Sequence, residues 1–235
     1  MTTAVVLAGG LGTRLKKVVP DLPKPMAPIS GRPFLEILLD YWIGQGITDF
    51  IISISYLSDI IVKHFGRSYH GVPISYSIEE SPLGTGGGLL LALNDLEEPI
   101  LVINGDTFIE VDFNKLLNFH LQQKSNWTFS LIESKNIDRY MGLDLKANGK
   151  ISFMESARKK ITKQLANGGA YIVNPVALKR LNLGNGITAS LEDELLTKYI
   201  SSGGEVFGLE CHGRFIDIGI PTDYKKAQSF LADLL

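Results

Sequence analysis

The chain has 235 residues, enough for one large domain with a buried core, and its 45% hydrophobic and 20% charged residues are ordinary for a globular protein. The formal net charge of -2 gives no general attraction to nucleic acid or to anionic membranes, so any phosphate site must be local. Cys211 is the only cysteine, which excludes an intramolecular disulfide and a zinc site built from several cysteines.

The sequence shows no targeting or membrane segment. Residues 1–4 carry no basic side chain, and Gly9 and Gly10 interrupt the apolar run that follows, so a signal peptide is not expected. The longest apolar runs, such as residues 89–93, are too short to span a bilayer. We therefore expect a cytoplasmic protein without nucleic-acid or membrane partners. The sequence does not fix the oligomeric state, and a homodimer is compatible with it.

The first element is an apolar strand over residues 4–8 that ends in the turn Gly9-Gly10-Leu11-Gly12-Thr13-Arg14. Such a turn leaves backbone N–H groups without partners, and with Arg14 and Lys24 it makes a positive site suited to phosphates. The dinucleotide fingerprint G-x-G-x-x-G fails because Leu15 stands at its third glycine, and the chain has no Walker sequence. A plain tight turn would explain the glycines but not the cations.

Helices and strands then alternate. Apolar residues recur at helical spacing over residues 33–43, residues 50–55 read as a buried strand, Ser58 caps a helix to about Phe65, and residues 74–78 form the next strand. This alternation predicts an α/β fold, with a Rossmann-like, mixed and mainly parallel sheet flanked by helices.

A second glycine-rich segment, residues 79–88, leads into an apolar helix over residues 89–96. Because ligands bind outside the carboxyl ends of parallel strands, the two glycine-rich loops should face one crevice. The next strand, residues 99–106, ends at Asp106. A lone aspartate there is usually a turn or cap residue, but beside a triphosphate it would suit Mg2+, a hard cation with oxygen ligands.

The elements that follow are less regular. Asp112 caps a helix whose apolar face carries His120, which we interpret as a packed residue. Residues 127–132 read as a strand, and residues 139–156 read as a hairpin that turns at Asn148-Gly149.

The last part of the chain returns to regular structure. Ser190-Leu191-Glu192-Asp193 has the form of a helix capping box, which makes Glu192 and Asp193 structural. Residues 205–210 form a strand, and Asp217 ends a short apolar segment before Pro221 opens a final helix.

Several strings together resemble the sugar-1-phosphate nucleotidyltransferases: Leu7-Ala8-Gly9-Gly10-Leu11-Gly12-Thr13-Arg14, Pro23-Lys24-Pro25-Met26, Asn104-Gly105-Asp106-Thr107 and Phe215-Ile216-Asp217-Ile218-Gly219. The resemblance covers nearly the whole chain and implies the GT-A-like fold of the nucleotide-diphospho-sugar transferases. It implies one domain over residues 1–235, with a nucleotide-binding core over about 1–133, a small sugar-binding lobe over about 134–185, and a return to the core over about 186–235.

The resemblance also implies roles for particular side chains. Arg14, Lys24 and Asp106 would be catalytic, with Arg14 on the triphosphate and Lys24 bridging toward the sugar phosphate. Asp106 and Asp217 would hold Mg2+, the expected cofactor. The implied nucleotide-binding residues are Leu7, Ala8, Gly9, Gly10, Gly12, Thr13, Glu79, Pro82, Gly84 and Thr85.

Glu79 falls where the family reads the edge of the base. A carboxylate only accepts hydrogen bonds, and guanine offers two adjacent donors where uracil offers one, which favours GTP over UTP or dTTP. Glu80, the other glutamate of this pair, is interpreted as a solvated residue.

The implied sugar-binding residues are Gly142, Glu155, Asn167 and Gly169. Two departures from the family pattern fall in this lobe. Met141 separates Tyr140 from Gly142 where the family has Tyr-Gly, and Ser156 replaces the lysine of its Glu-Lys pair. The sugar phosphate thus loses one cation unless Lys159, Lys160 or Lys24 supplies it.

The subgroup that fits best is the short heptose and mannose 1-phosphate guanylyltransferases. The expected reaction joins GTP and a sugar 1-phosphate to give a GDP-sugar and pyrophosphate. The favoured sugar substrate is D-glycero-alpha-D-manno-heptose 1-phosphate. No residues follow Leu235 to form an added domain, so the longer bifunctional members are not expected.

Two alternatives stay open. The first is the same chemistry with mannose 1-phosphate, or with uridylyl or thymidylyl transfer in place of guanylyl transfer. The second is a regulatory homologue that binds a GDP-sugar without catalysis, which is motivated by Met141 and Ser156.

Overall fold

The computed structural model describes residues 2–10, 12–93, 95–133, 143–153, 165–184 and 186–234. The strands are β1 (Thr3–Leu7), β2 (Pro28–Ile29), β3 (Arg32–Pro33), β4 (Asp49–Ile54), β5 (Ser68–Tyr69), β6 (Val72–Ile78), β7 (Ile100–Asn104), β8 (Thr107–Ile109), β9 (Trp127–Glu133), β10 (Leu143–Leu145), β11 (Ile151–Phe153), β12 (Leu165–Val173), β13 (Phe207–Glu210) and β14 (Phe215–Asp217). The helices are α1 (Phe34–Gly44), α2 (Ser58–Phe65), α3 (Gly84–Ala92), α4 (Phe113–Gln122), α5 (Pro175–Lys179), α6 (Thr197–Ser201) and α7 (Pro221–Phe230). Short helical segments are η1 (Lys24–Met26), η2 (Leu191–Leu196) and η3 (Ala232–Leu234).

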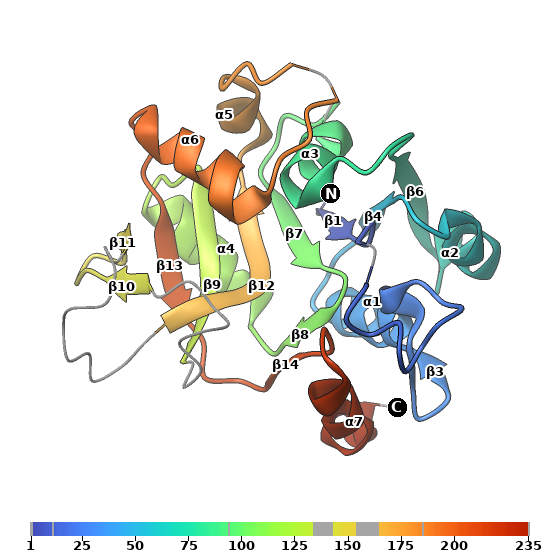
Figure 1. Ribbon diagram of the computed structural model, residues 1–235. Helices are drawn as coiled ribbons and strands as arrows, with labels where there is room; N and C mark the ends of the chain where they lie inside the picture. Colours follow the sequence, from blue (N-terminus) through green and yellow to red (C-terminus); the bar gives the residue numbers. More distant parts are fainter. Residues whose placement is uncertain are drawn as a thin grey trace.

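A central mixed sheet organises the molecule (Figure 1). Its strands lie in the order β11-β10-β12-β7-β1-β4-β6-β5, and β9 pairs with both β12 and β13 beside this path. Parallel pairing joins β1 to β4 and β7, β4 to β6, and β9 to β13, whereas β12 runs antiparallel to β7 and β9. The predicted α/β fold with a mixed, mainly parallel sheet is therefore confirmed.

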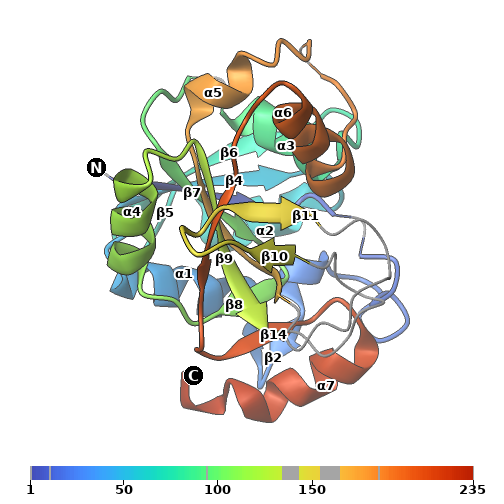
Figure 2. The same ribbon diagram turned by 90° about the vertical axis from the view of Figure 1, so that its left-hand side faces the viewer.

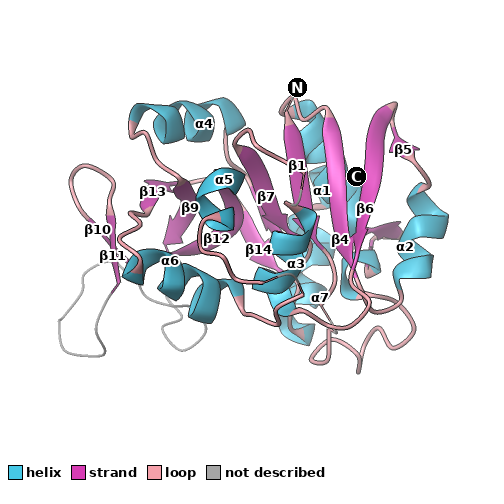
Figure 3. Cartoon of the chain, turned by 90° about the horizontal axis from the view of Figure 1, so that it is seen from above, coloured by secondary structure: helices cyan, strands magenta, loops and turns pink. Residues whose placement is uncertain are grey.

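Helices cover both faces of the sheet. Seen from above, α1 and α4 lie on one side and α3 and α6 on the other (Figure 3). Alternate residues of β1 point to the two sides: Val6 packs in the core that contains Leu38 of α1, and Val5 packs in the core that contains Leu89 of α3. Both faces of the strand are thus buried, as its unbroken apolar sequence predicts.

A small antiparallel sheet of β8 and β14 closes the carboxyl end of β7. Asp217 of β14 lies opposite Thr107 of β8, and the next residue, Ile218, donates its N–H to the carbonyl oxygen of Asp106 at 3.0 Å. Helix α7 follows directly and lies beside β14 (Figure 2). This pairing brings the C-terminal part of the chain, with Asp217, to the carboxyl end of β7, a strand from the middle of the sequence.

The predicted boundary of α3 is wrong. The helix begins at Gly84 rather than Leu89, so the glycine-rich segment is itself its first turns. The N–H groups of Gly86 and Gly87 both donate to the carbonyl oxygen of Ala189, at 2.8 and 3.2 Å. A Cβ on Gly87 would lie 2.1 Å from the carbonyl oxygen of Ile187. Close approach of another chain segment therefore requires glycine here and outweighs its poor helix propensity.

One predicted helix cap is wrong, and a second is confirmed with a different carboxylate partner. Ser58 is the first helical residue of α2 and makes no capping hydrogen bond; Leu57 precedes it with φ of 55°. At η2, the Ser190 hydroxyl accepts the N–H of Asp193 at 3.1 Å, but the carboxylate that accepts the Ser190 N–H belongs to Glu194, at 2.7 Å. The wider turn of this π-helical segment moves the reciprocal contact one residue along the chain.

Other elements follow the sequence interpretation. Asp112 caps α4 by accepting the N–H of Lys115 at 3.0 Å, and His120 is buried with its Nδ1 at 2.9 Å from the Thr128 hydroxyl. Burial lowers the pKa of His120 to about 4. The interpretation of His120 as a packed residue is confirmed.

The segment expected to form the sugar lobe contains the hairpin of β10 and β11 and strand β12, and all three strands belong to the central sheet. Strands β10 and β11 pair with Leu143 opposite Phe153, and they lie to one side of β9 in Figure 2. Strand β12 joins the hairpin to the middle of the sheet, because it pairs with β10 at Leu165 and with β7 over residues 170–173. None of the helices that the structure describes is long and apolar enough to cross a membrane.

Candidate active site

A cavity of about 540 Å³ lies at the carboxyl ends of β1, β4 and β7, and residues of both glycine-rich segments line it. A parallel sheet places ligands at this edge. Most residues proposed from the sequence line this cavity: Leu7, Ala8, Gly9, Gly10, Arg14, Lys24, Glu79, Pro82, Gly84, Thr85, Asp106, Asn167 and Asp217.

Three proposed residues do not line the cavity. Gly12 packs against the Lys24 side chain, Thr13 is exposed, and Gly169 packs against Thr107. Gly142 and Glu155 lie outside the described residues, as do Met141, Ser156, Lys159 and Lys160.

The first turn is anchored so that Arg14 reaches the cavity wall. The carbonyl oxygen of Gly12 accepts the N–H groups of Leu15 and Lys16 at 2.9 and 3.2 Å, and the Leu15 side chain is buried. Lys16 lies over the Tyr56 ring, 4.4 Å from its centroid. The Arg14 guanidinium is exposed and bonds to none of the described residues, so it presents a positive charge to any anion in the cavity.

Two aspartates and a lysine lie close together at the cavity wall. Lys24 Nζ forms an ion pair with Asp106 Oδ2, and Asp106 Oδ1 accepts the Thr107 hydroxyl at 3.2 Å. Asp217 Oδ1 accepts the N–H of Gly219 at 2.6 Å, which fixes the orientation of that carboxylate. A Cβ on Gly219 would lie 2.8 Å from Lys24 Nζ, so the ammonium group reaches the turn after Asp217 as well.

These two carboxylates fit a magnesium ion. Mg2+ takes oxygen ligands and is held by one or two carboxylates together with waters and substrate phosphates. Within the described residues, no group of three or more His, Cys, Asp or Glu side chains is suited to hold a metal by itself. The donor set of Asp106 and Asp217 therefore suits a metal that arrives with a phosphate ligand.

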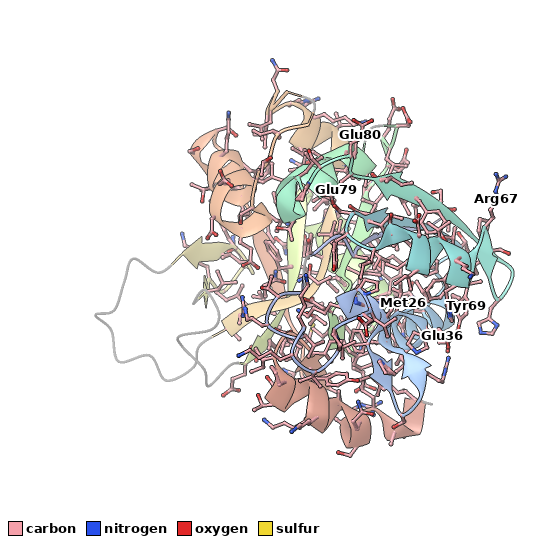
Figure 4. All side chains as sticks on the ribbon, turned by 45° about the vertical axis from the view of Figure 1, so that its right-hand side comes forward. Met26, Glu36, Arg67, Tyr69, Glu79 and Glu80 are labelled. Carbon is pink, nitrogen blue, oxygen red and sulfur yellow. The ribbon has the colours of Figure 1, made fainter. Side chains whose placement is uncertain are left out.

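Glu79 is held firmly inside the cavity. It is 9% exposed, its Oε2 accepts the N–H of Leu83 at 2.8 Å, and its Oε1 accepts the Ser53 hydroxyl at 3.4 Å. The neighbouring Glu80 is exposed; Figure 4 shows Glu79 closer to the middle of the molecule than Glu80. Glu79 thus fixes the start of the second glycine-rich segment while presenting acceptor oxygens to the cavity.

The sequence interpretation named Asn167 of β12 but missed two other cavity residues, Tyr171 of β12 and Glu192 of η2. A bulge in β12 shifts its register against β9 between Asn167 and Tyr171, and Gly169 within it has φ of 83°. Both Asn167 and Tyr171 line the cavity, as does Glu192 of η2, which the capping-box pattern had made structural. The Asn167-Gly168-Gly169 sequence was the available signal, because glycine at positive φ is typical of a bulge.

A family model for nucleotidyl transferases matches residues 3–233. The chain therefore belongs to the nucleotidyl transferase family and is an enzyme of the nucleotidyltransferase class, as its motifs predicted.

Two relatives and one solved structure show which nucleotidyltransferases the chain resembles. The D-glycero-alpha-D-manno-heptose 1-phosphate guanylyltransferase of Aneurinibacillus thermoaerophilus is 40% identical over 97% of this chain and 97% of its own length. The enzyme of the same name from Campylobacter jejuni is 38% identical over 94% of this chain and 96% of its own. The crystal structure of HddC from Yersinia pseudotuberculosis complexed with GMP-PN matches with a TM-score of 0.82 and 36% identity, covering 97% of this chain and 99% of that one.

Proposed function

We propose that this protein joins GTP and D-glycero-alpha-D-manno-heptose 1-phosphate to give a GDP-sugar and pyrophosphate. The observation that carries the proposal is that Arg14, Lys24, Asp106 and Asp217 line one cavity, which Glu79 also lines. The names of the two relatives and the GMP-PN complex of HddC support the choice of guanine nucleotide and heptose.

The reaction needs no covalent enzyme intermediate. An oxygen of the sugar phosphate attacks the alpha-phosphorus of GTP, a new P–O bond forms, and the bond to the beta-phosphate breaks to release pyrophosphate. The barrier comes from repulsion between two polyanions and from poor alignment, so the protein must position them in line and neutralise charge.

Different residues of the chain position the two substrates and neutralise their charge. Arg14 binds the phosphates that leave as pyrophosphate, and Lys24 exchanges its contact with Asp106 for the phosphate of the sugar. Asp106 and Asp217 would hold Mg2+, which when bound neutralises charge on the phosphates of both substrates. Glu79 accepts hydrogen bonds from the two adjacent donors of guanine, in a position already fixed by Leu83 and Ser53.

The remaining assignments complete the proposal. The nucleotide lies against Leu7, Ala8, Gly9, Gly10, Pro82, Gly84 and Thr85. Gly12 and Thr13 contribute to the turn that carries Arg14, rather than to the cavity wall. The sugar is held by the lobe of residues 134–185, with Gly142, Glu155 and Asn167 as its binding residues. Gly169 orients the Asn167 amide through its backbone N–H. We place the enzyme in the cytoplasm, because both substrates are water-soluble phosphates produced inside cells.

A substrate panel tests the proposal. Pyrophosphate release is measured with GTP, ATP, UTP and dTTP against heptose, mannose and glucose 1-phosphates. We expect GTP with the heptose phosphate to give the highest kcat/KM. A higher value with mannose 1-phosphate or with another nucleotide would replace the substrate assignment, and binding of GDP-sugar without pyrophosphate release anywhere in the panel would indicate a regulatory homologue.

A further inference from the structure

Glu192 differs from the two acidic residues beside it. All three lie in the first turn of η2, but Glu194 accepts the N–H of Ser190, and Asp193 Oδ2 accepts the Ser190 hydroxyl at 3.3 Å. Both carboxylates therefore contribute to capping the N-terminus of η2. Glu192 instead lines the cavity, where its Oε1 accepts an N–H of the Asn167 side chain at 2.9 Å.

The Asn167 amide is held in one orientation. Its Oδ1 accepts the N–H of Gly169 at 2.9 Å inside the β12 bulge, so its Nδ2 faces Glu192. Because an amide nitrogen carries two hydrogens, one remains available beside the second oxygen of Glu192. No described residue hydrogen-bonds to that second oxygen. A fixed donor and a fixed charged acceptor thus lie side by side at the cavity wall.

Tyr171 supplies an independent observation that a ligand belongs here. Its side chain is fully buried yet borders the cavity, and its hydroxyl has no hydrogen-bond partner among the described residues. Burial raises its pKa well above the ordinary value, and the charges of Glu192 and Asp106 add to this, so the group stays a neutral O–H donor. A buried hydroxyl without a partner is costly and is normally satisfied by water or a ligand.

The strand order shows which part of the substrates faces these residues. Glu79 follows β6 and Asp106 follows β7, whereas Asn167 and Tyr171 lie on β12, on the other side of β7. If the base lies at Glu79 and the phosphates at Asp106, the ribose lies between them. The β12 side is then left for the sugar of the sugar phosphate. A carboxylate repels phosphate but accepts hydrogen bonds from hydroxyl groups.

We propose that Glu192 is a sugar-binding residue, whose carboxylate accepts hydrogen bonds from ring hydroxyls while Asn167 positions it and Tyr171 completes the subsite. This inference rests on the proposed function and deepens it, because it assigns a specificity residue for the sugar. A hydroxylated pyranose is the ligand class, since it offers neighbouring neutral donors to one carboxylate.

Comparing the binding of GDP with that of GDP-mannose separates the contribution of the sugar from that of the nucleotide. GDP-mannose carries ring hydroxyls that a manno-configured heptose shares, so the change in the ratio of the two dissociation constants between a variant and the wild type reports the sugar contacts. Calorimetry with Mg2+ present is carried out on the wild type, Glu192→Gln, Tyr171→Phe and the matched control Asp193→Asn. Thermal unfolding of each variant checks that it is folded.

We expect Glu192→Gln to weaken GDP-mannose about 10-fold or more and to leave GDP unchanged, because a charged hydrogen-bond acceptor is lost. Tyr171→Phe should weaken GDP-mannose without lowering the unfolding temperature, and Asp193→Asn should change neither ligand. Unchanged GDP-mannose binding in Glu192→Gln, or equal weakening of GDP, would overturn the inference and leave the proposed function standing. Failure of GDP to bind the wild type would overturn both.

Discussion

The N–H of Ile218 donates to the carbonyl oxygen of Asp106 at 3.0 Å, and through this bond the second aspartate of the cavity is placed beside the first. The pairing of Asp217 with Thr107 continues the same contact into a two-stranded sheet. Lys24 then forms its ion pair with Asp106. The charge centre is therefore assembled by backbone pairing between β8 and β14, which holds both carboxylates with little freedom to separate.

The two aspartates are expected to be individually essential. Asp106→Asn or Asp217→Asn keeps the side-chain size but removes one negative charge, and each should lower kcat about 100-fold or more. Pyrophosphate release with GTP checks this, and Mn2+ titration in the presence of GTP should show weakened metal binding. Asp59→Asn, on the exposed first turn of α2, serves as the control with the same charge change. Full activity in either variant would contradict the metal assignment.

Lys24 is expected to affect turnover more than nucleotide binding. Lys24→Met removes the ammonium group that would hold the sugar phosphate, and kcat should fall about 100-fold while the Kd for GTP changes little. Lys63→Met, an exposed lysine of α2, controls for the loss of one surface charge. A rise in the Kd for GTP as large as the fall in kcat would instead place Lys24 on the triphosphate.

Glu79 is expected to set the preference for guanine. Glu79→Gln replaces one acceptor oxygen by a donor, so the ratio of kcat/KM for GTP to that for UTP should fall about 10-fold. The same change at the exposed neighbour, Glu80→Gln, should leave the ratio unchanged. Because Glu79 also accepts the Leu83 N–H, thermal unfolding is measured alongside. An unchanged ratio in a folded Glu79→Gln enzyme would remove Glu79 from base selection.

Gly87 is expected to tolerate no side chain. In Gly87→Ala the Cβ meets the Ile187 carbonyl oxygen and the Leu83 side chain, and separating these backbones should cost about 1–3 kcal/mol or more of unfolding free energy. Gly44→Ala is the matched control, because nothing lies within 4 Å of its added Cβ. Chemical denaturation measures both, and equal stability of the two variants would disprove the close contact.

His120 is expected to make stability fall with acid. Its pKa is lowered from 6.5 to about 4 in the folded state by burial, so between these pH values the unfolded chain binds a proton that the folded chain does not. The free energy of unfolding should therefore decrease as the pH drops through this window, by up to about 3 kcal/mol. In His120→Gln this part of the pH dependence should disappear, whereas the exposed His212→Gln should retain it. Denaturation midpoints at pH 7, 6, 5 and 4 test the slope.

The local sequence was a good guide where short-range physics decides the outcome. The apolar strand before Gly9, the helix from Phe34 and the cap at Asp112 were all predictable, because periodicity and capping depend on residues close in the chain. The start of α3 was not. Its glycines are required by the close approach of Ala189 and Ile187, which lie far away in the sequence.

The sequence by itself determined the nucleotidyl transferase family, because continuous motifs carry it. It also predicted a phosphate site at the first glycine-rich turn, with Arg14, Lys24, Asp106 and Asp217 as the charged residues. Only the tertiary structure decided that Glu194, not Asp193, caps Ser190 through its carboxylate, and that Glu192 lies at the cavity beside Asn167. The reason is physical: a carboxylate's role depends on which donors surround it, and here those donors come from a strand bulge and a π-helical turn that meet only in the folded chain.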